Sequence, residues 1–186
     1  MAHGFTLEDA WELPVTGGPE DFERLISIFT SFDPASWQKS PTKLLWATRD
    51  RLGQVFGLGR ISRSAQRETP TRLAGRLPAD LRGSASGVQF PSLPFIPLYR
   101  TQEEFAAELS NATVHGLMHL AWLPQPDGTF RGEMAVYVRP HGRAGRAYMA
   151  LIRPFRHWIV YPALGRQVQH AWETGGTRLQ RSGPEQ

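Results

Sequence analysis

Two histidines on one short segment are the residues whose types and spacing first suggest chemistry. His115 and His119 lie in "VHGLMHLAWL", residues 114–123, shortly before the pair Asp127-Gly128. Asp-Gly after such a segment is typical of a β-hairpin turn, so we expect a strand here. Along a strand four residues span about 13 Å, which is too far for two imidazoles to hold one metal ion. We therefore predict no shared metal site, and histidines that are either polar groups in a cavity or structural or exposed residues.

The second strand of this hairpin, 130–140, would place more polar side chains opposite the histidines. Alternation puts Arg131, Glu133, Tyr137 and Arg139 on one face and apolar residues on the other. Histidine, glutamate and tyrosine together are typical of acid–base chemistry, whereas such a row is also typical of a solvated face with cross-strand ion pairs. The candidate catalytic residues are thus His115, His119, Glu133 and Tyr137.

Other acidic side chains show no spacing typical of catalysis. Glu103, Glu104 and Glu108 are expected to be surface charges rather than a carboxylate dyad. No nucleophile with a partnered base is visible in the spacing. We favour no enzymatic activity, although the sequence does not decide the question.

The elements that would position these residues follow from hydrophobic periodicity. Strands are predicted at 5–15, at 95–100 and, in preference to a helix, at 103–111. Two helices are predicted after the first strand, from Pro19 to before 33–34 and from Ser40 to Gly57. A long helical segment follows Gly142 and extends through Trp172, with Gly175 as its stop.

Two prolines interrupt this last helix. Its polar residues change sector between 157 and 166, so we predict a kink or break at Pro162 and only a bend at Pro154. A helix covering the core is favoured over an interfacial membrane helix, because the hairpin needs something to bury its apolar face.

Composition excludes several classes of protein. The formal net charge is +4, but the excess arises from six arginines in the Arg/Gly/Pro-rich segment 59–94, which we interpret as a long loop. No nucleic-acid-binding motif accompanies them, so nucleic acid is not an expected partner. With no cysteine, no secretory signal and no run of about 18 apolar residues, the sequence predicts no membrane span and a cytoplasmic location.

This order of elements is that of an α+β helix-grip domain, in which a curved antiparallel sheet packs on a long kinked C-terminal helix. We assign 1–175 to a single domain and 176–186 to a flexible tail. A cavity between sheet and helix would bind a hydrophobic small molecule or lipid. The residues expected to line it are Trp122, Met134, Tyr148, Met149 and Phe155.

The chain resembles the bacterial domain-of-unknown-function 2867 family in "DAWEL", "WATRDRLGQVFGLG", "HGLMHLAW" and, most specifically, "GRAYMALIRPFRHWIVYPAL". The resemblance implies a START/Bet v 1-like (SRPBCC) helix-grip fold and carries over no catalytic residue. Some members are fused to a nicotinamide-binding oxidoreductase domain, but no G-x-G-x-x-G follows a strand here, so no cofactor is expected.

Three functions therefore remain open on the sequence. The first is binding of a hydrophobic small molecule or lipid. The second is a cyclase, isomerase or hydrolase using polar residues in the cavity, and the third is a non-catalytic interaction or accessory domain using the arginine-rich loop. The sequence predicts no particular oligomeric state.

Overall fold

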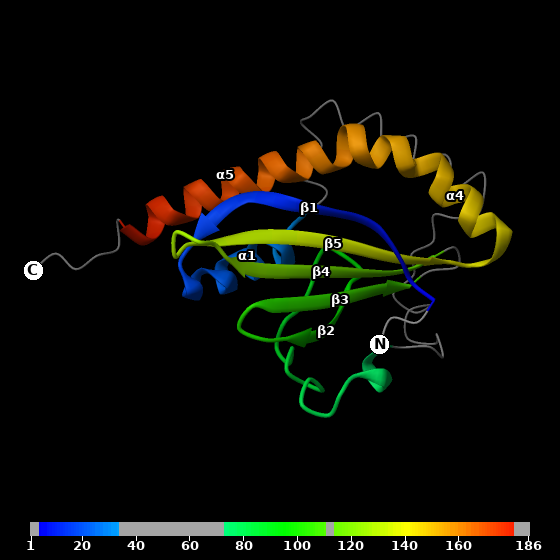
Figure 1. Cartoon of the computed structure of the whole chain (residues 1–186), viewed down its shortest axis with the longest axis horizontal. Coiled ribbons are helices and arrows are strands. Elements are labelled where there is room, and N and C mark those ends of the chain that lie inside the picture. Colours follow the sequence, from blue (N-terminus) through cyan, green and yellow to red (C-terminus); the bar gives the residue numbers. More distant parts are fainter. Residues whose placement is uncertain (1–3, 34–72, 111–113, 181–186) are drawn as a thin grey trace, which may run out of the picture.

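The computed structural model describes residues 4–33, 73–110 and 114–180, and its centre is a five-stranded antiparallel sheet with the order β1-β5-β4-β3-β2 (Figure 1). The strands are β1 (Thr6–Gly17), β2 (Ile96–Arg100), β3 (Glu104–Ser110), β4 (Val114–Pro124) and β5 (Phe130–Pro140). The helices are η1 (Pro19–Asp21), α1 (Phe22–Thr30), η3 (Leu73–Arg76), α4 (Gly142–Phe155), η4 (Arg156–Val160) and α5 (Tyr161–Gln180).

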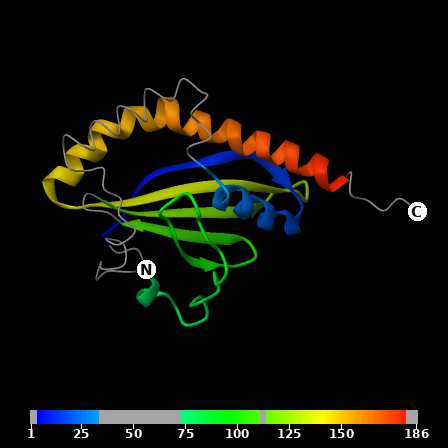
Figure 2. The same ribbon diagram turned by 180° about the vertical axis from the view of Figure 1, so that it is seen from behind.

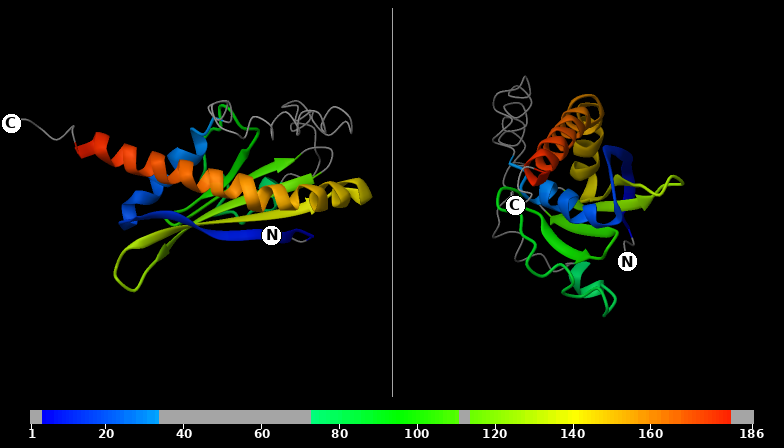
Figure 3. Two further views of the ribbon diagram at one scale, coloured as in Figure 1. Left: turned by 90° about the horizontal axis from the view of Figure 1, so that it is seen from above. Right: turned by 90° about the vertical axis from the view of Figure 1, so that its left-hand side faces the viewer.

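One face of the sheet packs against α1 and the long C-terminal helix, which runs along β1 (Figures 1 and 3). Trp122 at the centre of this core is fully buried and lies between the rings of Phe22 and Trp172. The contact between layers is close at Gly132, where a β-carbon would lie 3.1 Å from a methyl of Leu25. This end of the interface is therefore filled by large side chains.

The opposite face is covered in part by the segment that contains η3. Leu73 and Leu77 are buried against Leu98 and Ala106, next to the ring of Phe5. The sheet thus has an apolar layer on both faces, and Figure 2 shows α1 and the η3 segment from the other side.

The predicted strands are confirmed, including the strand interpretation of 103–111. An α+β fold with an antiparallel sheet and a long C-terminal helix is also confirmed. The second predicted helix, 40–57, lies outside the described residues, as does the first part of the predicted loop 59–94; from residue 73 onward that loop contains η3 and several turns.

The last helix differs from its prediction in two ways. It is not broken at Pro162, which is the second residue of α5; the irregularity is the π-helical turn η4, which ends at Val160. The helix also passes the expected stop at Gly175 and ends at Gln180, because glycine at an αR position costs only about 1 kcal/mol. None of the described helices combines the length and hydropathy needed to cross a bilayer.

Candidate functional site

A bulge in β1 changes which face of the sheet its residues occupy. Leu7 pairs with Tyr137 and Asp9 with Val136, so Glu8 is an extra residue on β1. Regular alternation would place Leu7 and Asp9 on the same face. Asp9 faces the long helix together with Trp11 and Leu13, and the bulge places Leu7 on the other face. The period-two pattern of 5–15 is therefore interrupted at Glu8 and is kept from Asp9 to Val15.

The helix is irregular where it faces this bulge. The π-helical turn η4 begins at Arg156, between Pro154 and Pro162. Single π turns are uncommon in proteins as a whole, but those that occur are often at functional sites. The Arg156 guanidinium lies 3.0 Å from a carboxylate oxygen of Glu8 and 3.5 Å from one of Asp9. Both acidic residues of the bulge thus contact one arginine.

Asp9 is the centre of the resulting cluster. Its side chain is only 5% exposed, and one of its oxygens lies 3.1 Å from His157 Nε2. The Tyr161 hydroxyl donates a hydrogen bond to the other oxygen, and the Tyr161 ring packs on Trp11 with centroids 4.1 Å apart. We call these residues the Asp9 site: Glu8, Asp9, Trp11, Arg156, His157 and Tyr161.

The electrostatics of the Asp9 site keep Tyr161 protonated. Burial, followed by the hydrogen bond to Asp9, raises the pKa of Tyr161 well above the ordinary tyrosine value. The phenol therefore remains a hydrogen-bond donor across the neutral range. Two carboxylates face one guanidinium in this cluster, so it carries one net negative charge while His157 is neutral.

The arrangement can do two kinds of chemistry. The His157 side chain is 43% exposed, and its contact with Asp9 is its one hydrogen bond to a described residue. When Nε2 carries the proton and directs it at Asp9, the other ring nitrogen, Nδ1, is left as a hydrogen-bond acceptor. Trp11 Nε1 and Arg156 Nε are buried donors without a hydrogen-bond partner in the described part of the chain. Such donors are suited to a ligand oxygen, because an unmet buried donor costs about 1–3 kcal/mol.

The four sequence-predicted catalytic residues lie elsewhere. The pairing of β4 with β5 places His115, His119, Glu133 and Tyr137 on the face away from α4 and α5. They do not line the contact between sheet and helix. The polar row of β5 lies opposite the histidines as predicted, with Arg139 across from His115, but Arg131 at its other end pairs with Glu12 of β1 at 2.8 Å.

His115 is a buried structural histidine. Its Nε2 lies 2.9 Å from Glu108, and the edge of its ring meets Phe5. Glu108 is not a surface charge as predicted: its side chain is 4% exposed and accepts the amide hydrogen of Leu73 at 3.2 Å. Leu73, which covers Glu108, belongs to the η3 segment, distant in sequence from β3. The spacing of residues along β3 therefore gives no sign that Glu108 is buried.

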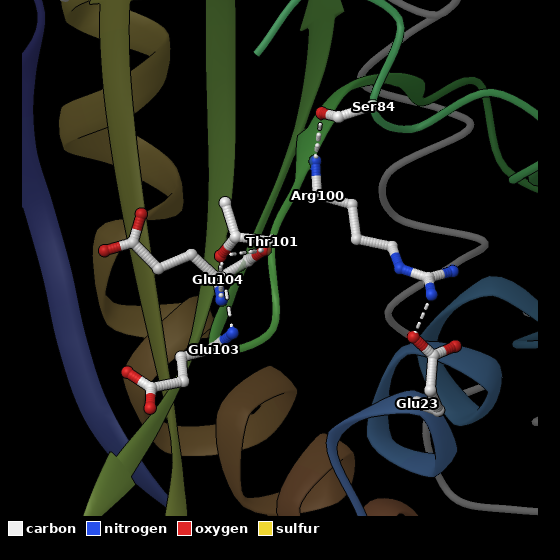
Figure 4. Close-up of polar contacts among 6 residues, drawn as sticks. All are labelled: Glu23, Ser84, Arg100, Thr101, Glu103 and Glu104. Carbon is white, nitrogen blue, oxygen red and sulfur yellow. Dashed lines mark hydrogen bonds and ion pairs between the residues drawn. The ribbon is translucent and has the colours of Figure 1, made fainter. Parts of the chain in front are cut away.

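A second polar group on this face is open to solvent. His119 Nε2 lies 3.6 Å from Glu104, which accepts a hydrogen bond from Tyr99 at 3.1 Å. Burial and the neighbouring Glu104 raise the pKa of Tyr99. Glu103 and Glu104 are exposed as predicted, at a turn whose backbone amides bond to Thr101 (Figure 4).

The predicted ligand-lining residues divide between two parts of the helix side. Trp122 and Met134 belong to the main core, whereas Tyr148 and Met149 pack over Val138 near α4. The position of the Phe155 side chain lies outside the description. In the described residues no group of three or more His, Cys, Asp or Glu could hold a metal ion.

Sequence reasoning missed the Asp9 site entirely. Arg156 and His157 were assigned to a polar helix sector, and Asp9 to an alternating strand. Two signals were nevertheless present: an adjacent acidic pair in an otherwise alternating strand, and two prolines that bracket the residues opposite it.

Comparison with known proteins identifies the family. The family model described as a protein of unknown function (DUF2867) matches residues 1–163. The chain therefore belongs to the DUF2867 family. Neither the curated proteins nor the solved structures contain a match to it.

Proposed function

We propose that this DUF2867 protein binds a small, largely apolar molecule whose polar head carries a hydrogen-bond-accepting oxygen at the Asp9 site. The observation that carries the proposal is the pair of buried, unpartnered donors, Trp11 Nε1 and Arg156 Nε. Both belong to side chains already held in place, Trp11 by the Tyr161 ring and Arg156 by Glu8. A ligand oxygen would meet donors whose orientation has been fixed before binding.

The apolar part of the ligand would lie under α4 rather than under α5. The α5 end is filled by Trp122, Trp172 and the fully buried Val168. Near α4 the contact is lined by Met149 and the half-buried Tyr148, two of the residues expected to line a binding site. In this proposal Trp122 is a packing residue, and Met134, the cross-strand partner of Trp11, lies between the two regions.

The charge of the site selects the head group. The two carboxylates of Glu8 and Asp9 face the single guanidinium of Arg156. An anionic head group would therefore be repelled, and a neutral carbonyl oxygen is preferred. The expected ligand class is therefore a neutral, medium-chain molecule with a ketone, ester or amide group. A START/Bet v 1-like helix-grip fold for the family would agree with this location between sheet and helix.

The test uses 2-undecanone as a neutral probe and decanoate as its anionic counterpart. Indole N–H resonances of the ¹⁵N-labelled protein report binding, because Trp11 Nε1 should shift on addition of 2-undecanone. Trp11→Phe should weaken binding about 2- to 12-fold, the value of one neutral hydrogen bond. Trp158→Phe serves as the control, because Trp158 is 84% exposed. Decanoate binding as tight as the ketone, or equal affinity in Trp11→Phe, would contradict the proposal.

General-base catalysis is a second candidate function, favoured by the geometry of Asp9 and His157. A buried carboxylate 3.1 Å from a partly exposed imidazole orients the ring. His157 would then remove a proton from a water that attacks the carbonyl of a bound ester, and the alcohol would leave.

Hydrolysis of p-nitrophenyl decanoate tests this second function. His157→Gln should lower the rate by about 10²- to 10⁴-fold, and Asp9→Asn should lower it as well. His170→Gln, also exposed on the same long helix, is the matched control. A rate that is the same in the wild type and in His157→Gln excludes His157 as the base.

A further inference from the structure

The outer side of α4 and η4 carries two parallel stripes of exposed side chains. The apolar stripe consists of Ala147, Leu151, Pro154 and Trp158, which follow one another at spacings of four, three and four residues. The basic stripe beside it consists of Arg143, Arg146 and Arg153. All seven residues are exposed, and we call them together the outer ridge. At helical rise it is about 22 Å long.

The apolar stripe contains the most exposed large hydrophobic residue of the described chain. Trp158 is 84% exposed and Leu151 is 53% exposed. Neither is needed for the core, because the same helix turns Met149 inward and buries it. A tryptophan held on the outside of a rigid helix is suited to a boundary between water and an apolar phase, where its ring and its N–H are both accommodated.

The basic stripe has no acidic counterpart nearby. Between Glu133 and Glu173 the chain contains no acidic residue and six arginines. Of these, Arg156 pairs inward with Glu8 and Asp9, but no ion pair to a described residue engages Arg143, Arg146 or Arg153. Their charges are therefore available to an anionic partner outside the described part of the chain.

The shape of the helix presents the ridge outward. The long helix arches over the sheet, and the outer side of the arch at α4 and η4 faces away from the strands (Figures 1 and 2). A convex, amphipathic surface of this kind can rest along its length on a flat partner. Phosphate groups alone would account for the arginines but not for Trp158 and Leu151.

We propose that the outer ridge docks on the surface of an anionic lipid bilayer. Trp158 and Leu151 would enter the interface between head groups and acyl chains, and Arg143, Arg146 and Arg153 would contact the anionic head groups. The helix lies on the bilayer and does not cross it. This proposal is independent of ligand binding at the Asp9 site, because no residue of the outer ridge belongs to that site.

The test is sedimentation of the full chain with vesicles at low salt. Vesicles of phosphatidylcholine with about one third phosphatidylglycerol should bind the protein, and pure phosphatidylcholine vesicles should bind it far more weakly. Salt at 0.5 M should release it, because screening removes the attraction of exposed arginines. A blue shift of tryptophan emission that is lost in Trp158→Phe would place this ring at the interface.

Two sets of variants separate the ridge from the net charge of the chain. Trp158→Ser should weaken binding about 10-fold, since it removes a buried ring, and Arg153→Gln should weaken it about 5-fold, the value of one charge near the surface. The matched controls, Leu123→Ser and Arg76→Gln, are exposed on other surfaces and should not change it.

Three results would overturn the proposal. The first is no binding to anionic vesicles at low salt, and the second is equal loss of binding in ridge and control variants. The third is binding of a short DNA duplex that depends on the arginines but not on Trp158, without vesicle binding. Thermal unfolding of each variant confirms that it is folded, and exposed substitutions should change stability by no more than about 0.5 kcal/mol.

Discussion

Replacing Asp9 by asparagine should destabilise the fold far more than the corresponding replacement of any neighbouring carboxylate on β1. The change keeps the shape of the side chain but removes the charge that faces His157 and Arg156 and accepts the Tyr161 hydroxyl. One hydrogen bond to a charged group is worth about 1.5–3 kcal/mol. Arg156 retains Glu8 as a partner, so the full cost of a stranded buried charge does not arise. We expect a loss of about 2–4 kcal/mol.

Glu12 on the same strand provides the matched control. It also pairs with an arginine, at 2.8 Å, but its side chain is 61% exposed, whereas that of Asp9 is 5% exposed. A solvated ion pair contributes about 0–1 kcal/mol. Glu12→Gln should therefore change stability by at most about 1 kcal/mol, and the difference between the two variants isolates the effect of burial.

Urea unfolding followed by circular dichroism measures both variants. The midpoint should fall in Asp9→Asn at an unchanged slope, because the same surface is exposed on unfolding. A double-mutant cycle with Tyr161→Phe should show a coupling of about 1 kcal/mol or more. Equal stability of Asp9→Asn and Glu12→Gln would refute the reasoning that the Asp9 site is a buried, mutually dependent cluster.

Three further predictions concern the rest of the fold. Spectrophotometric titration should show Tyr161 and Tyr99 ionising above the ordinary tyrosine range, with one of these two steps missing in Tyr161→Phe. Because the pKa values of both phenols are raised in the fold, the stability that they contribute is complete below about pH 10 and is lost as the pH rises further. Urea unfolding at alkaline pH would detect this loss. Glu108→Gln should cost about 1.5–3 kcal/mol, because it removes the buried carboxylate that contacts His115 and accepts the Leu73 amide hydrogen. The exposed Glu104→Gln should cost under about 1 kcal/mol, and similar urea midpoints for the two variants would contradict this. Gly132→Ala should lower the free energy of unfolding by about 1–3 kcal/mol, since its β-carbon would lie within 3.3 Å of three core side chains. An unchanged thermal unfolding temperature would show that the sheet and α1 can move apart enough to accept the methyl group.

The parts of the fold that sequence predicts well are those determined by local chemistry. The hairpin of β4 and β5 follows from Asp127-Gly128, where Gly128 takes a positive φ of 84° and the Asp127 carboxylate accepts the amide hydrogen of Thr129. The long helix likewise follows from its own residues. Each of these signals lies within a few positions of the feature it predicts.

The parts that were missed depend on residues far apart in the chain. Glu108 is buried because Leu73 and its neighbours cover it, and β3 itself carries no sign of that cover. Asp9 faces the helix as the alternation with Trp11 and Leu13 predicts, but its partners Arg156 and Tyr161 come from the other end of the chain, and β1 itself carries no sign of them. The catalytic candidates on β4 and β5 had suitable residue types, but sequence alone does not indicate which sheet face the helices cover.

The bulge of β1 and the π turn of the helix contact each other at the Asp9 site through Glu8 and Arg156. Asp9 lies on the same face of β1 as Trp11 and the buried Leu13, and Glu8, the extra residue of the bulge, is a second carboxylate in contact with Arg156. A π turn adds one residue to a helix and so rotates the buried face by about 100°. This rotation explains the change of polar sector between 157 and 166 without a break at Pro162, and it allows Tyr161 to meet Asp9 while Val168 remains in the core.

Such an arrangement is costly as architecture alone. A regular strand beside a regular helix would bury apolar side chains in the same place without a carboxylate, a guanidinium and an unpartnered indole donor. Local rules of sequence and structure are most often broken where a protein binds or reacts. The coincidence of a strand bulge, a π turn and unmet buried donors is the reason that we propose a ligand at the Asp9 site rather than in the filled core around Trp122.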